Sequence, residues 1–175
     1  MSPGGVESCP GCGFVWADVP AAAVGARVVA GAGAIAAALR ASPEAAVATR
    51  PEPGRWSALE YACHLRDVMY AQRDRLVLGL VEDDPAFRPM YRDHRVDLGL
   101  YATDQAAIVA DELALAGGLF ARTFAALDDA QLARRCVYGY PAPTPRTLLW
   151  VGQQTVHEAE HHRADVEENL AAAGS

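Results

Sequence analysis

Apolar and small residues recur with helical spacing in four long stretches of the chain. The stretches cover residues 21–41, 57–80, Thr103 to about 127 and Thr144 to about 172. No alternating pattern typical of strands and no internal repeat interrupts them. The sequence therefore predicts an all-α protein, a four-helix bundle whose two long connections allow crossovers between parallel helices.

The predicted helix starts carry capping signals. Ser57 precedes Glu60 by three positions, which is the capping-box arrangement. Thr103 can cap the third helix, and Thr144 followed by Pro145 places a cap before a proline at the first helical position. Residues 82–103 and 138–145 are rich in turn-forming residues and are expected to be connections.

Composition and charge narrow the classes of function. The chain has 175 residues, 51% of them apolar, so one domain with a substantial core is expected. Its formal net charge is −7 and all 15 basic residues are Arg, which argues against nucleic acid and anionic membranes as partners. Arg27 and the small residues of 21–41 argue against a membrane span. Without a signal-like start, a cytoplasmic location is expected.

Three of the five histidines fall within six residues of the predicted last helix. His157 and His161 are four positions apart, the spacing at which two imidazoles can hold one metal ion. His162 is turned by about 100° from His161. A metal usually takes a third protein ligand, and His64 on the second helix is the candidate. A solvated histidine pair is the plainer alternative.

Residues 157–161 also match the pattern H-E-x-x-H, in which Glu158 would act as general base in a hydrolase. A metzincin would need Gly and His where this chain has Ala164 and Glu167. A peptidase is therefore disfavoured. Glu158 remains a candidate base or a plain helix-surface charge.

Together, Trp56-Ser57, Glu60, His64 and the H-x-x-x-H run with His162-Arg163 resemble the DinB-like superfamily over residues 50 to 170. The resemblance implies a four-helix bundle with a divalent metal held by His64, His157 and His161. It also implies a thiol-dependent S-transferase or isomerase that uses bacillithiol, glutathione or mycothiol. The lysine-free, Arg-rich composition indicates a GC-rich genome, which favours mycothiol.

The chemistry of such a site can be stated from the residues. Three neutral imidazoles leave the charge of the ion intact, so a bound thiol would be held as thiolate and attack a small electrophilic substrate. Zinc is the expected ion, with nickel and iron as alternatives. Arg66, Arg146 or Arg163 could offset developing charge, and Met90, Tyr138, Tyr140 and Trp150 could line a pocket. A metal-stabilised bundle without turnover is the other class, and a homodimer is left open.

Residues 1–19 form a separate segment ahead of the bundle at 20–175, and they contain Cys9-Pro-Gly-Cys12. This motif resembles half of a zinc ribbon, so Cys9 and Cys12 are candidate metal ligands. Cys63, Cys136, His94, His162 or a second subunit could complete the site. A redox dithiol and an ordinary turn remain alternatives. The segment could also fold over the histidine site and contribute a ligand or a lid.

Overall fold

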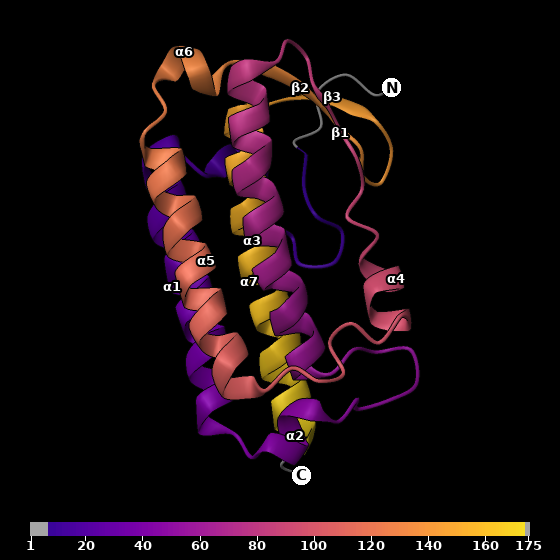
Figure 1. Ribbon diagram of the computed structural model, residues 1–175. Helices are drawn as coiled ribbons and strands as arrows, with labels where there is room; N and C mark the ends of the chain where they lie inside the picture. The colour runs from indigo at the N-terminus through magenta and orange to yellow at the C-terminus, as the bar shows by residue number, and fades with distance from the viewer. Residues whose placement is uncertain (1–6, 174–175) are drawn as a thin grey trace.

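Four long helices lie side by side in the structure, a computed structural model that describes residues 7–173 (Figure 1). They are α1 (Ala21–Ala41), α3 (Ala58–Val81), α5 (Ala106–Ala125) and α7 (Leu148–Ala173). Helix α7 packs against α1 and α3, and α5 packs against the same two helices from the other side. The predicted four-helix bundle is confirmed, with α3 and α5 parallel across a long connection.

One short element, η1 (Trp16–Asp18), precedes α1, and the other short elements lie in the connections between the long helices. The others are α2 (Glu44–Ala48), β1 (Ala86–Phe87), α4 (Arg92–Asp97), α6 (Asp129–Leu132), β2 (Arg135–Tyr138) and β3 (Thr144–Thr147). Strand β2 pairs with β1 in parallel and with β3 in antiparallel orientation. This small sheet lies at the end of the bundle away from α2 (Figure 1). The sequence did not predict it, because strands this short give no sustained alternation.

One of the three predicted caps is present. The Ser57 hydroxyl accepts a hydrogen bond from Glu60 N at 3.1 Å, and the Glu60 carboxylate accepts one from Ser57 N at 2.8 Å. The cap at Thr144 was wrong because residues 144–147 pair with β2, and Thr147 accepts a hydrogen bond from Trp150 N instead. The cap at Thr103 was also wrong, since α5 begins after Gln105.

Small residues allow α1 to pack closely in the bundle. A Cβ on Gly31 would lie 2.9 Å from the Cβ of Ala159 on α7, and one on Gly25 would lie 3.4 Å from that of Ala121 on α5. By length and composition alone α1 could cross a membrane, as core helices of soluble proteins also could. In the bundle, α1 packs against α5 and α7.

Candidate metal sites

Helix α7 carries two interleaved pairs of side chains of the kinds that can bind a metal ion. His157 pairs with His161, and Glu158 pairs with His162, each across four positions. Neighbouring residues on a helix point about 100° apart, so the two pairs face in different directions. Ala159 faces α1 through Gly31, which fixes the rotation of α7 in the bundle.

The second pair meets a histidine from α3. Ligand atoms of His64, Glu158 and His162, here called the pocket cluster, all lie within 4.8 Å of one another. Glu158 Oε2 is 3.2 Å from His162 Nε2 and 3.8 Å from His64 Nε2. The two histidines are only 3% and 5% exposed, so the cluster is largely shielded from water.

Neighbouring groups orient two of the three side chains. His162 Nδ1 lies 2.8 Å from Asp165 Oδ2, and Gln154 Nε2 donates to Glu158 Oε1 at 2.6 Å. Among the described residues, neither nitrogen of buried His64 has a hydrogen-bond partner. A buried imidazole without a partner is costly unless something else binds it. Two imidazoles and a carboxylate, with one imidazole unpaired, therefore fit a divalent metal with positions left open.

Burial and neighbouring groups shift the pKa values of all three side chains in the pocket cluster. Burial alone would disfavour the charged imidazole of His162, but hydrogen bonds to Asp165 and Glu158 raise its pKa to about 9. Burial would raise the pKa of Glu158, yet the neighbouring imidazoles of His162 and His64 hold it well below the usual value. Burial is the main cause that lowers the pKa of His64. Glu158 as a carboxylate and His64 as a neutral imidazole are thus in the forms that bind a metal, whereas the charged imidazole of His162 would have to release its proton to do so.

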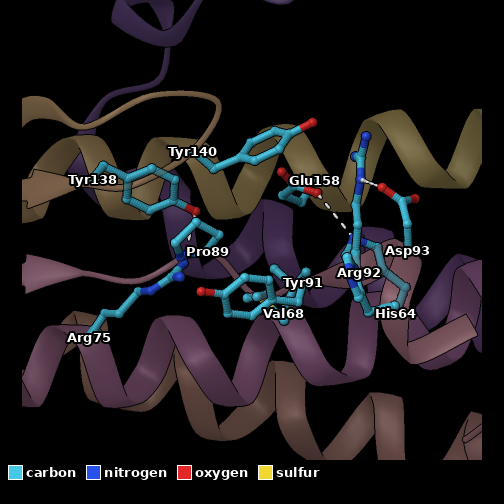
Figure 2. Close-up of a pocket in the computed structure, with 12 residues that line it drawn as sticks. His64, Val68, Arg75, Pro89, Tyr91, Arg92, Asp93, Tyr138, Tyr140 and Glu158 are labelled. Carbon is cyan, nitrogen blue, oxygen red and sulfur yellow. Dashed lines mark hydrogen bonds and ion pairs between the residues drawn. The ribbon is translucent and has the colours of Figure 1, made fainter. Parts of the chain in front are cut away.

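A cavity of about 230 Å³ opens beside the pocket cluster, and His64 and Glu158 form part of its wall (Figure 2). Its apolar lining includes Val68, Met90 and the ring of Tyr138. The volume suits a small molecule or one end of a larger one.

Two arginines also line this cavity, and their surroundings differ. Arg75 donates hydrogen bonds to Gln72, the Tyr138 hydroxyl and the Arg88 carbonyl, so its guanidinium is occupied by the protein. Arg92 lies 5.2 Å from the ring of Tyr140, and its Nε has no hydrogen-bond partner among residues 7–173. Its Nε is 3.8 Å from Asp93. Arg92 is therefore the better placed of the two to meet an anionic group.

The first pair on α7 meets the N-terminal segment. Ligand atoms of Cys9, Cys12, His157 and His161, here called the knuckle cluster, all lie within 4.8 Å of one another. Cys9 and Cys12 are free thiols. The sequence motif and the histidine pair thus come together from opposite ends of the chain.

Comparison with known proteins places the chain in a family. The sequence profile of the DinB superfamily matches residues 29–166. The chain belongs to the DinB superfamily. No curated protein sequence matches it significantly.

Two solved structures share the fold of this DinB superfamily protein. YfiT from Bacillus subtilis, described as a probable metal-dependent hydrolase with an unusual four-helix bundle topology, is 21% identical. It matches with a TM-score of 0.73 over 86% of this chain and 87% of its own. A mycothiol-dependent maleylpyruvate isomerase is 12% identical, with a TM-score of 0.69. That match covers 87% of this chain and 63% of the isomerase.

The five metal ligands expected from the sequence are divided between the two clusters. His64 does not join His157 and His161 in the described structure; it lies with Glu158 and His162 instead. The reason is the rotation of α7, which turns the pair at 158 and 162 toward α3. The sequence interpretation set His162 aside and treated Glu158 as a base. The four-residue spacing between Glu158 and His162 is the sequence signal that could have identified them as candidate ligands.

Other candidates from the sequence lie elsewhere. Cys63 donates to Asp104, Cys136 is buried in β2, and His94 lines the cavity, so within residues 7–173 none of them completes the knuckle cluster. The arginines proposed to offset charge form ion pairs away from the cavity: Arg66 with Glu112, Arg146 with Glu7 and Arg163 with Glu167. The proposed pocket residues Met90, Tyr138 and Tyr140 do line it, whereas Trp150 stacks on Trp16.

Proposed function

We propose that this protein is a metal-dependent enzyme that acts on a small electrophilic substrate. It would either transfer a low-molecular-weight thiol to the substrate or use the thiol to isomerise it. The observation that carries the proposal is the pocket cluster in the wall of the cavity, because His64 and Glu158 face the space that a substrate would occupy. His64, Glu158 and His162 would hold a divalent ion, with zinc expected first and nickel or iron as alternatives. When bound, such an ion would hold a thiol as thiolate at neutral pH.

The chain's own residues would prepare the site. Asp165 fixes the ring of His162, so that Nε2 faces the cluster, and Gln154 fixes the carboxylate of Glu158. The apolar side chains of Val68 and Met90 would exclude water from the reacting groups. Arg92 would attract an anionic part of the substrate or the thiol.

A thiol is proposed ahead of water for two reasons. One structural neighbour is a mycothiol-dependent isomerase, and the lysine-free composition is typical of the GC-rich genomes in which mycothiol would be expected. The Glu158 carboxylate also lies among the ligand atoms and accepts a hydrogen bond from Gln154. Glu158 is therefore proposed as a ligand, whereas the H-E-x-x-H hydrolase needs it as a free base. The proposed location is the cytoplasm, where low-molecular-weight thiols are kept reduced.

The decisive experiment measures turnover with and without a thiol. The protein would be loaded with zinc, nickel or iron and assayed against small epoxides, alkyl halides and unsaturated ketones. We expect turnover that requires both the ion and the thiol and that is lost in His64→Ala. Turnover without any thiol would favour the hydrolase. Stoichiometric metal without turnover would favour a structural bundle, and either result would overturn the proposal.

A further inference from the structure

We infer that the knuckle cluster is a second metal site, a structural zinc site formed by Cys9, Cys12, His157 and His161. Two thiolates and two imidazoles form one of the common closed ligand sets of structural zinc. The site uses none of the residues of the pocket cluster. The inference therefore stands whether or not the proposed enzymatic function is correct.

The geometry fits tetrahedral coordination. With zinc bonds of about 2.0–2.3 Å, the ligand atoms of a tetrahedral site lie about 3.3–3.8 Å apart. In the knuckle cluster each residue offers one ligand atom, and all four atoms lie within 4.8 Å of one another. The rings of His157 and His161 are 5.2 Å apart and come from one face of α7. Small side-chain adjustments would bring all four onto one ion.

The two histidines have nitrogens that nothing else uses. Among the described residues, both nitrogens of His157 and Nδ1 of His161 are buried without a hydrogen-bond partner. The rings of Phe14 and Trp16 lie 5.2 and 5.0 Å from that of His157 and shield it. A partly buried imidazole next to aromatic rings gains nothing from its polar nitrogens unless they bind a ligand. A metal ion supplies that ligand.

The local sequence builds the turn that brings the two cysteines together. Gly13 N donates to the Cys9 carbonyl at 2.8 Å, and Cys9 N donates to the Phe14 carbonyl at 2.8 Å. Gly13 adopts a φ of 73°, which favours glycine. A Cβ on Gly11 would lie 3.4 Å from His161 Cε1, so a small residue lets the turn approach α7. The turn is shaped to reach the histidine pair.

The zinc ion would fasten the N-terminal segment along α7. Trp16 Nε1 donates to Gln154 Oε1 at 2.7 Å, and Gln153 Nε2 donates to the Val19 carbonyl at 3.0 Å. These are ordinary polar contacts, and a closed metal site would add a far stronger constraint. Gln154 also donates to Glu158, so the N-terminal segment is linked to the pocket cluster through Gln154.

Cobalt substitution tests the site, because cobalt bound to cysteine sulfur absorbs in the near ultraviolet and only the knuckle cluster contains sulfur. The metal-free protein would be titrated with cobalt and zinc, and bound metal measured by mass spectrometry. We expect two equivalents and a sulfur-to-cobalt band. The variant Cys9→Ser/Cys12→Ser should bind one equivalent without the band. Cys136→Ser is the matched control for loss of a thiol and should behave as the unchanged protein.

Two further measurements keep the test independent of folding and of the pocket. His64→Ala/His162→Ala empties the pocket cluster and should keep one equivalent together with the band. In the unchanged protein, Cys9 and Cys12 should resist alkylation until a chelator is added. The inference is overturned if the cysteine variant keeps the band, if the histidine variant loses it, or if alkylation is equally fast without chelator. Failure of the proposed enzymatic function would appear only as absent turnover.

Discussion

The pocket cluster and the knuckle cluster use consecutive residues of the same helix and differ in almost every other respect. The pocket cluster has three nitrogen and oxygen donors, contains two buried histidines and borders a cavity. The knuckle cluster has four donors, two of them sulfur, and includes exposed Cys12. An incomplete set beside a cavity leaves room for a substrate, whereas a complete set leaves none. The number of donors and the access to them are the basis for proposing a chemical site at the pocket cluster and a structural site at the knuckle cluster.

The largest effect is expected when the pocket cluster loses a ligand. His64→Ala or His162→Ala should lower pocket metal affinity and turnover by more than about 100-fold, because even the loss of a supporting group costs about 10–100-fold. Metal content and steady-state kinetics measure the change. The sulfur-to-cobalt band should persist, and its loss would show that the two clusters are not separate.

Gln154 contacts both the N-terminal segment and the pocket cluster, so its replacement sharpens the comparison. Gln154→Leu should weaken pocket metal binding by about 10–100-fold, because Glu158 loses its hydrogen-bond donor. Gln153→Leu is the matched control, since it removes a bond to Val19 and none to Glu158. Competition with a chelator of known affinity measures both variants. Equal effects would mean that the segment, and not the contact with Glu158, determines the affinity.

Arg92 tests the cavity beside the pocket cluster. Arg92→Gln should raise KM for an anionic substrate or thiol by about 10-fold with little change in kcat, because a charged hydrogen bond is lost in binding. Arg163→Gln removes the same charge from an exposed position on α7 and should leave both constants unchanged. A fall in kcat alone would place Arg92 in the reaction rather than in binding.

The smallest expected effect concerns the contact that sets the rotation of α7. Gly31→Ala places a methyl group against Ala159 and should cost about 1 kcal/mol, which lowers Tm by roughly 2–4 °C. Gly33→Ala on the same helix meets nothing within 4 Å and should raise stability by about 0.5–1 kcal/mol. Thermal unfolding followed by circular dichroism distinguishes them. Equal behaviour of the two variants would contradict the close packing of α1 on α7.

The sequence was sufficient for the bundle because its signals are local. Ser57 and Glu60 cap a helix through contacts three positions apart, which a short stretch of sequence is enough to reveal. The cap at Thr103 lay two positions before the observed N-cap, and the cap at Thr144 failed because a tertiary contact overrides the local preference. Residues 144–147 gain a strand partner in β2, which a single stretch of sequence does not reveal.

The ligand sets could be predicted only in part, for a different physical reason. Spacing shows that His157 and His161 share a face, and that Glu158 and His162 share another. It does not show which face turns toward α3, because that depends on the packing of Ala159 against Gly31. The contact of Cys9 and Cys12 with α7 spans nearly the whole chain, and no local pattern encodes it.

Because the two pairs on α7 are offset by one residue, the two sites are separate in space and could also be gained or lost independently in evolution. Every ligand beside the cavity belongs to α3 or α7, so a relative could lose the cysteine turn without changing any of them. Such a relative would present two bare imidazoles to water along a strip of α7. Related proteins could therefore gain or lose the knuckle cluster while the ligands of the pocket cluster stay the same.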